Sequence, residues 1–232
     1  MRPYAEALMR LIYPAQCGIC KLALGLHDRE LCPACRKKLV QLRRDPVQAI
    51  MSQRFAAVAN AWSIYPYEGP VRDLLTAVKF SGKQWLISAF RSELRELSQA
   101  LAADNSYDAV IPVPMDRRHY VEREFNQAEL LAAIVSQASG IPLERRILSK
   151  RFSLTRQSSL GREARRHNLR DAFRARSKRV RGQRLLLVDD ILTTGATSQE
   201  AATTLRLAGA RQVDLLVLAR TEASDSPRAA SL

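Results

Sequence analysis

Two adjacent carboxylates, Asp189 and Asp190, directly follow the apolar run LLLV and precede a loop rich in threonine. Carboxylates are acceptor-only side chains, which suit a ligand with neighbouring hydroxyls or a divalent cation. The next segment, TTGAT, offers hydroxyls, backbone N–H groups and a glycine ahead of a predicted helix, whose positive N-terminal end stabilises an anion. A sugar phosphate satisfies both halves, with its diol on the carboxylates and its phosphate in the loop.

The same stretch differs from the common nucleotide-binding loops, because it contains neither GK[ST] nor GxGxxG. The alternative interpretation is an acidic strand end followed by a helix cap made of hydroxyls. Capping explains one threonine and leaves the adjacent carboxylates unexplained.

Four cysteines form two CxxC knuckles, Cys17 with Cys20 and Cys32 with Cys35, separated by eleven residues. Each CxxC turn points two thiolates at one centre, so the two turns together predict a tetrahedral zinc site. A chance cluster of buried or redox-active cysteines is the alternative, and the spacing argues against it. Four thiolates leave the metal no open position for water, so we expect a structural zinc and not a catalytic one.

Strands and helices alternate around these residues. Strand patterns occupy 61–65, 107–114, 184–190 and 212–221, and helical patterns occupy 71–80, 84–101, 125–140 and 198–210. Asn126 is placed to cap the third of these helices and Gly140 to end it. This order predicts an α/β domain with a mainly parallel sheet flanked by helices. Ligands of such sheets collect at the carboxyl ends of the strands, where the two adjacent carboxylates lie.

Residues 185–197 resemble the phosphoribosyl pyrophosphate (PRPP) signature of type I phosphoribosyltransferases: four apolar residues, two acids, two apolar residues and a Thr/Gly-rich loop. The resemblance implies a type I phosphoribosyltransferase-like fold and a PRPP site that works with Mg²⁺. It implies that Asp189 and Asp190 are the catalytic carboxylates and contact the ribose hydroxyls. It also implies a 5-phosphate loop made of Thr193, Thr194, Gly195, Ala196 and Thr197.

Five segments in a fixed order are similar to the ComF/GntX family of competence-associated phosphoribosyltransferase-like proteins. They are the two knuckles, LLTAVKFSGK, VIPVPMDRRHYVEREFNQAELLA, RQSSLGREARRHNLRDAF and the PRPP motif. The resemblance implies a link to DNA uptake in natural transformation, with single-stranded DNA and a DNA-uptake helicase or other competence proteins as partners. That family usually has Gly before the Phe of its FNQ element. Glu124 stands here, and its carboxylate would repel a phosphate bound at that loop.

Two basic stretches are candidates for holding pyrophosphate. In KFSGK, Lys79 and Lys83 supply charge and Gly82 allows a turn that is open to an anion. Arg117 and Arg118 follow a predicted strand end and could clamp phosphate oxygens with their forked guanidinium groups. The alternatives are a solvated helix cap for the lysines and a basic surface turn for the arginines.

The net charge of +14 is concentrated in residues 143–184, which hold fifteen Lys/Arg against three Asp/Glu. Three interpretations stay open for this basic segment: a mobile lid over PRPP, a track for the DNA backbone, or a solvated helical face. The residues of interest in it are Arg165, Arg166, Asn168 and Arg174.

A chain of 232 residues with 47% apolar residues fits one medium domain with a small appendage. We expect a zinc-ribbon module at 1–40, a helical connector at 41–59, a phosphoribosyltransferase-like domain at 60–221 and a disordered tail at 222–232.

No stretch of the sequence approaches the roughly 20 apolar residues of a membrane span. We therefore expect no membrane insertion and a cytoplasmic location, where cysteines stay reduced.

These observations leave two main functional hypotheses. The first is a PRPP-binding phosphoribosyltransferase-like protein that transfers its pentosyl group to an unidentified acceptor, or makes no transfer at all. The second is a non-catalytic, single-stranded DNA-binding protein of the uptake machinery, with PRPP as ligand or regulator. A partner-binding protein with a vestigial site is a third interpretation. The sequence does not address the oligomeric state.

Overall fold

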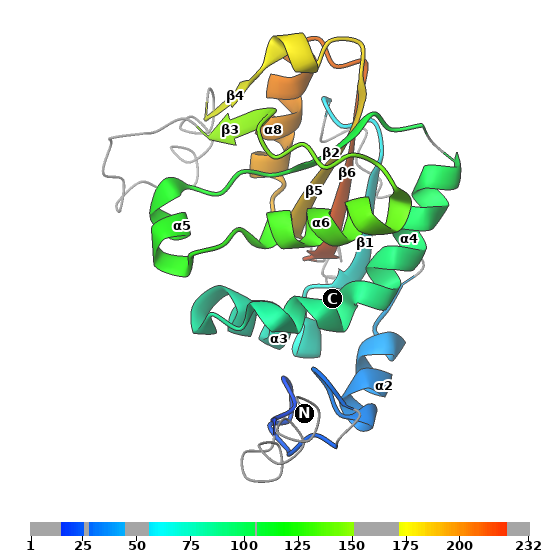
Figure 1. The fold of residues 1–232 in the computed structure, drawn as a ribbon, viewed down its shortest axis with the longest axis vertical. Coiled ribbons are helices and arrows are strands. Elements are labelled where there is room, and N and C mark those ends of the chain that lie inside the picture. The colour runs from blue at the N-terminus through cyan, green and yellow to red at the C-terminus, as the bar shows by residue number, and fades with distance from the viewer. Residues whose placement is uncertain (1–14, 26–27, 45–55, 105, 151–171, 222–232) are drawn as a thin grey trace, which may run out of the picture.

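The computed structural model describes residues 15–25, 28–44, 56–104, 106–150 and 172–221. A parallel four-stranded sheet lies at its centre, in the order β1-β6-β5-β2 (Figure 1). Its strands are β1 (Ala61–Pro66), β2 (Ala109–Pro112), β5 (Arg184–Leu192) and β6 (Gln212–Arg220). The sheet confirms the predicted α/β fold, and its two central strands, β5 and β6, are its longest ones.

Strand β5 shows why the sheet is covered on both faces. Residues 185–188 are all apolar, and each is 0% exposed. Because successive side chains of a strand point to opposite faces, Leu185 and Leu187 join one hydrophobic cluster while Leu186 and Val188 join the other. A strand with no solvated face must lie between two layers, as the apolar run predicted.

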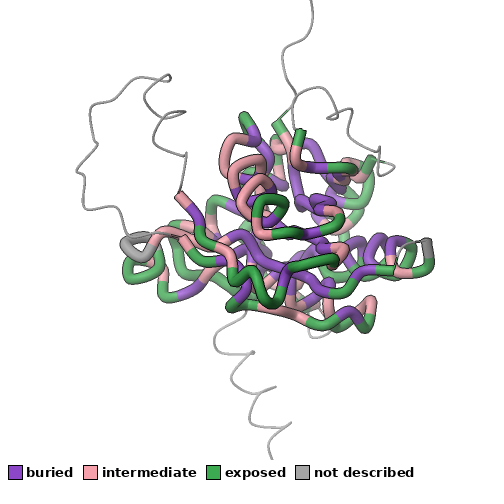
Figure 2. Tube along the Cα trace, turned by 90° about the horizontal axis from the view of Figure 1, so that it is seen from above, coloured by how far each residue is buried: buried purple, intermediate pink, exposed green. Residues whose placement is uncertain are grey.

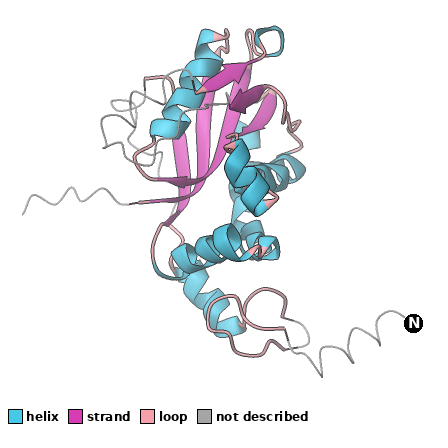
Figure 3. Ribbon diagram, turned by 90° about the vertical axis from the view of Figure 1, so that its left-hand side faces the viewer, coloured by secondary structure: helices cyan, strands magenta, loops and turns pink. Residues whose placement is uncertain are grey.

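Helices form both of these layers (Figure 3). One face packs against α3 (Gly69–Ser81), the 3-10 helix η1 (Gln84–Phe90), α4 (Arg91–Asp104) and α6 (Gln127–Ser139). The other face packs against α8 (Ala196–Leu207) and a small antiparallel pair, β3 (Leu148–Lys150) with β4 (Phe173–Ala175). The short helices α5 (Arg117–Arg123) and η2 (Ser177–Arg179) complete the described elements that follow residue 60. Buried segments run through the middle of the domain and exposed ones surround them (Figure 2).

One predicted helix differs from the structure. The pattern predicted a single helix over 84–101, whereas the chain forms η1 and then α4. A 3-10 helix has three residues per turn, so Leu86 stacks on Ala89 and Ile87 on Phe90. All four of these side chains are buried.

The cysteine module shares its hydrophobic core with the larger domain. Helix α2 (Pro33–Gln41) begins inside the second knuckle, and Leu39 of this helix is buried in the same cluster as Tyr65 and Phe90. A Cβ atom on Gly18 would lie 2.5 Å from Leu86 Cδ2 and 3.0 Å from Leu74 Cδ2, so the first knuckle needs glycine at this close approach.

Polar contacts reinforce this attachment. Arg36 donates hydrogen bonds to the Ala89 carbonyl and the Ser92 hydroxyl, and Arg43 makes two bonds of 2.6 Å to the Glu96 carboxylate.

The predicted domain boundaries at residues 40 and 59 stay predictions, since residues 45–55 lie outside the described part of the chain. The predicted tail at 222–232 lies outside it as well. Within the described ranges, no helix is long and apolar enough to cross a membrane.

Candidate functional site

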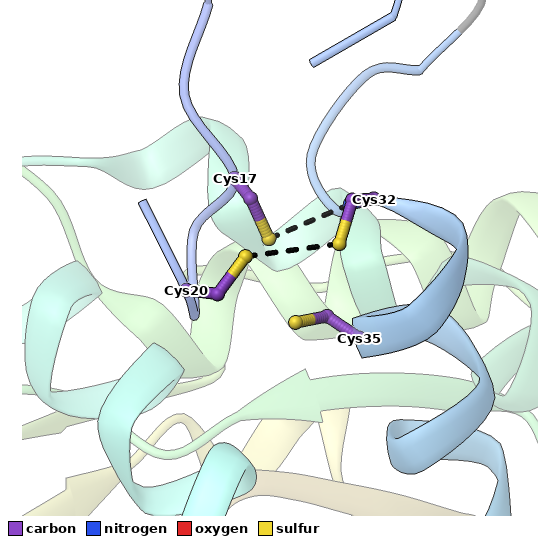
Figure 4. A group of neighbouring side chains, drawn as sticks. All are labelled: Cys17, Cys20, Cys32 and Cys35. Atoms are coloured by element: carbon purple, nitrogen blue, oxygen red, sulfur yellow. Dashed lines mark hydrogen bonds between the residues drawn. The ribbon is translucent and has the colours of Figure 1, made fainter. Parts of the chain in front are cut away.

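The four cysteines converge on one centre (Figure 4). All their Sγ atoms lie within 4.8 Å of one another, and the Sγ atoms of Cys20 and Cys32 are 3.7 Å apart. Zinc in a tetrahedron of thiolates at about 2.3 Å requires sulfur–sulfur distances of about 3.8 Å. The donor set and its spacing therefore fit a structural zinc ion held by Cys17, Cys20, Cys32 and Cys35.

The surroundings of the thiols set which ones ionise first. Burial opposes ionisation of Cys17, but hydrogen bonds lower its pKa to about 6, and the backbone N–H of Cys32 is the first of these donors. Burial and the neighbouring thiols raise the pKa of Cys35 to about 12. A metal must therefore displace the Cys35 proton on binding, as expected for thiolate ligands.

A second polar centre lies at the carboxyl end of β5, where Asp189 and Asp190 are both partly buried. Lys79, on α3, reaches across the end of the sheet and places its Nζ atom 2.7 Å from Asp190 Oδ2. Asp189 instead accepts hydrogen bonds from within its own segment, from the Asp190 N–H at 2.9 Å and from the Ser198 hydroxyl at 3.0 Å. The two carboxylates thus have different partners, one charged and one neutral.

The surroundings of Asp189 also change the pKa of its carboxyl group. Burial, followed by the negative charge of Asp190, raises the pKa of Asp189 from its ordinary value of 3.8 to about 7. The hydrogen bonds from Asp190 and Ser198 and the charge of Lys79 act in the opposite direction and offset only part of this effect. A carboxyl group with a pKa near neutrality, beside a second carboxylate that pairs with a lysine, is typical of a functional site.

The carboxylates line a cavity of about 160 Å³ between the ends of β2 and β5. Its wall holds both charges and polar groups, with cations on three different elements: Lys79 on α3, Arg123 on α5 and Lys150 on β3. The other residues lining the cavity are Val113, Pro114, Met115, Asp116, Asn126, Gln127, Ala128, Asp189, Asp190 and Thr197. Such a mixture of acids and cations suits a ligand that carries hydroxyls and phosphates.

The predicted phosphate loop forms the start of α8. Gly195 is the N-cap of this helix with φ of 74°, a left-handed conformation that favours glycine, and the helix begins at Ala196. Thr193 and Thr194 are exposed, and Thr197 reaches the cavity. Thr221 steadies the base of the loop, because its N–H and its hydroxyl both donate to the Leu192 carbonyl. Exposed hydroxyls and a helix N-terminus therefore lie directly beside the carboxylates.

Comparison with known proteins places the chain in a family. It is 32% identical over 229 residues to competence protein F of Haemophilus influenzae, an alignment that covers 88% of this chain and 96% of the relative. The chain belongs to the competence protein F (ComF) family. Competence protein ComFC of Bacillus subtilis is 30% identical over 198 residues, covering 75% of this chain and 77% of that one. DNA utilization protein YhgH of Escherichia coli K12 is 28% identical over 232 residues, covering 91% and 99%.

A family model for the phosphoribosyl transferase domain matches residues 126–231 of this ComF-family chain. Among solved structures, glutamine PRPP amidotransferase from B. subtilis is 26% identical, with a TM-score of 0.37 over 55% of this chain. The chain spans about a quarter of that enzyme, 26% of its length. Adenine phosphoribosyltransferase from Saccharomyces cerevisiae is 13% identical, with a TM-score of 0.37, covering 60% of this chain and 72% of that one.

The residues of this ComF-family protein that were predicted to hold pyrophosphate differ in their positions relative to the cavity. Lys79 lies in the cavity, but Gly82 and Lys83 are exposed at the end of α3 and are not among the residues that line it. Arg117 and Arg118 begin α5 directly after the cavity residue Asp116. Their side chains lie outside what the structure describes, so their role stays a prediction.

The ends of the basic segment come together in the β3–β4 pair, where Ser149 faces Arg174. Arg174 is exposed and lines a groove of about 630 Å³ together with Ser149, Ala175, Arg176, Ser177, Lys178 and Arg179. Arg165, Arg166 and Asn168 lie outside the described residues. The choice between a lid and a DNA track therefore stays open for the centre of the segment.

Glu124, where the family resemblance led us to expect glycine, adopts φ of 63°. Glycine is favoured in this left-handed conformation, so such a preference would have a backbone cause. The Glu124 side chain is exposed and is not one of the residues lining the cavity. The repulsion expected from its carboxylate therefore has no support in the described geometry.

Several residues at the ComF-family site were not predicted from the sequence. Ser198 and Thr221 position the carboxylate and the loop, and Asp116, Arg123 and Lys150 bring charge to the cavity wall. Asn126 was interpreted as a helix cap, which it is, with its Oδ1 accepting from the Ala128 N–H at 3.1 Å. Asn126 also lines the cavity. Its place in the segment that follows the predicted strand end at PVP was the one sequence feature that pointed to a position in the site.

Proposed function

We propose that this ComF-family protein binds PRPP together with Mg²⁺ and acts as a phosphoribosyltransferase-like protein linked to DNA uptake. The observation that carries the proposal is the direct succession of Asp189, Asp190 and the Gly195 helix start at the end of a buried central strand. Relatives named for competence and DNA utilization support the cellular role.

In this proposal the carboxylates of Asp189 and Asp190 accept hydrogen bonds from the ribose hydroxyls. The N–H groups and hydroxyls of the loop from Thr193 to Thr197 hold the 5-phosphate at the positive end of α8. Oxygen ligands such as these carboxylates suit Mg²⁺, which when bound supplies positive charge to the pyrophosphate. Lys79 lies where it can move from Asp190 to a ligand phosphate.

The protein therefore contributes positioning and electrostatics, and the acceptor of any pentosyl transfer is left unassigned. We place the reaction in the cytoplasm, because the cysteine cluster fits zinc only while its thiols stay reduced.

Isothermal titration with PRPP and Mg²⁺ tests the proposal. We expect saturable binding that weakens at least about 100-fold in Asp189→Asn/Asp190→Asn, since each hydrogen bond to a charged group is worth about 1.5 to 3 kcal/mol. The matched control is Glu68→Gln/Asp73→Asn, which removes two exposed carboxylates from the start of α3. Wild-type protein that binds zinc but not PRPP, or equal binding by both double variants, would contradict the proposal.

A second candidate function is binding of single-stranded DNA, with PRPP as ligand or regulator. The groove beside β4 favours it, because Arg174, Arg176, Lys178 and Arg179 are all exposed on its wall. Of these cations, Arg179 is paired with a carboxylate, that of Glu144 at 3.2 Å. A groove with this charge suits the phosphate backbone of a nucleic acid.

Fluorescence anisotropy with a labelled oligonucleotide tests this second function. We expect Arg174→Gln/Arg176→Gln/Lys178→Gln to weaken binding and to reduce the slope of log Kd against log salt by about 2, at about 0.7 per phosphate contact. A control that loses the same charge from α3, α4 and the α8–β6 turn, Arg72→Gln/Arg95→Gln/Arg211→Gln, should bind like wild type. Equal losses in both triple variants would show a nonspecific charge effect and count against the groove.

A further inference from the structure

Gln127, the first residue of α6, combines burial with an unused hydrogen-bonding group. Its side chain is 1% exposed, and its Nε2 atom has no hydrogen-bond partner among the described residues. Buried amide groups are nearly always paired, because an unpaired one forfeits the hydrogen bonds that it made with water. A residue of this kind is conspicuous at a helix start that the Asn126 side chain already caps.

The position of Gln127 explains which partner is missing. Gln127 lines the same cavity as Asp189, Asp190 and Lys79, so this residue lies in the wall of the proposed PRPP site, with its Nε2 atom buried behind the surface. The two carboxylates are already engaged, Asp189 with Ser198 and Asp190 with Lys79. A ligand that enters the cavity would bring acceptor oxygens to a donor that has no partner among the residues the structure describes.

We propose that the Gln127 side-chain amide donates a hydrogen bond to an oxygen of the phosphoribosyl ligand, and that it is a residue of the binding site and not of the core. This inference rests on the proposed function and adds to it a residue of α6 that lines the same cavity as the carboxylates. An amide suits the task, because it donates without bringing a charge that would compete with Lys79 or repel the ligand.

Access to the amide requires a small movement of the cavity wall. Met115 lines this cavity and also a neighbouring one of about 250 Å³, so its side chain has space on either side. Methionine is unbranched and adapts readily to a changed environment. A shift of this side chain is the small movement of the wall that the proposal requires.

Two substitutions separate a binding role from a structural one. Gln127→Leu and the nearly isosteric Gln127→Met both remove the unpaired amide. We expect each to leave the melting temperature of the ligand-free protein unchanged or raised, and to weaken PRPP binding about tenfold, as the loss of one ligand hydrogen bond predicts. Gln137→Leu, on the same helix but exposed, is the matched control and should change neither value.

Titrations with ribose 5-phosphate and with pyrophosphate locate the ligand oxygen. A tenfold loss for ribose 5-phosphate places the contact on the sugar or its phosphate, and a loss for pyrophosphate places it on the leaving group. The inference is overturned if both Gln127 variants bind PRPP as wild type does, or if their melting temperatures fall in step with affinity. Wild-type protein that binds none of the three ligands would overturn the proposed function as well, so the two failures are distinguishable.

Discussion

Replacing Cys35 with serine is expected to release zinc and to lower the free energy of unfolding by at least about 4 kcal/mol, as the loss of a structural metal does. The effect should be large because Cys35 is buried in the same hydrophobic cluster as Leu39, Tyr65 and Phe90. Loosening the metal site therefore loosens packing against α3 and η1 as well. Urea unfolding gives the energy, and a colorimetric chelator assay gives the zinc content.

Hydrogen exchange shows how far the effect spreads. Amides of α3 and η1 should lose protection in Cys35→Ser, since Leu74 and Leu86 pack directly against the first knuckle. Wild-type protein stripped of metal should behave in the same way and recover when Zn²⁺ is returned, whereas the variant should not recover. Full protection of α3 and η1 in the zinc-free protein would show that the module contributes nothing to the larger domain.

Replacing Asp189 with asparagine is expected to stabilise the ligand-free protein at pH 8, by up to about 4 kcal/mol at about 1.4 kcal/mol per pKa unit. The pKa of Asp189 is raised from 3.8 to about 7 on folding, by burial first and the charge of Asp190 second. The native state therefore binds more protons than the unfolded state between these two values. Wild-type protein must lose stability as the pH rises through this window, and the asparagine variant escapes that loss.

Urea unfolding of both proteins at pH 5 and pH 8 measures this effect. The advantage of Asp189→Asn should grow by about 2 to 3 kcal/mol between the two conditions, because most of the deprotonation of the folded carboxyl occurs there. Asparagine keeps one carbonyl oxygen that can accept from the Asp190 N–H, and its NH2 group can donate to the Ser198 hydroxyl, so packing is a minor variable. An advantage that is the same at both pH values would show that Asp189 is ionised throughout and that its pKa is not raised.

Much of the fold and part of the candidate site could be predicted from local sequence patterns. The run LLLV was apolar enough to require a strand buried on both faces, and β5 is such a strand. The cysteine spacing predicted one metal centre, and the four Sγ atoms lie together. These predictions succeeded because neighbouring residues in the chain specify strands, turns and knuckles.

Contacts between distant segments could not be predicted in the same way. Lys79 was a candidate because of its charge, but its pairing with Asp190 depends on how α3 crosses the end of β5. Gln127 lies within the predicted helix 125–140, and only the cavity beside it distinguishes it from the other residues of that helix. Glu124 was interpreted through its charge, whereas the backbone angle at its position would explain a preference for glycine. Packing and backbone geometry decided these cases, and neither follows from residue type alone.

The order of strands in the sheet has a practical consequence for anyone who divides this protein into fragments. The phosphoribosyl transferase match begins at residue 126, yet β1 and β2 precede it in the chain and form the two outer strands of the sheet. An expression fragment that starts there would keep β5 and β6 and strip the hydrogen-bonding partner from the outer edge of each. Bare, apolar strand edges recruit other chains. The region that sequence comparison outlines is thus too short to be produced alone, and soluble material should begin upstream of β1.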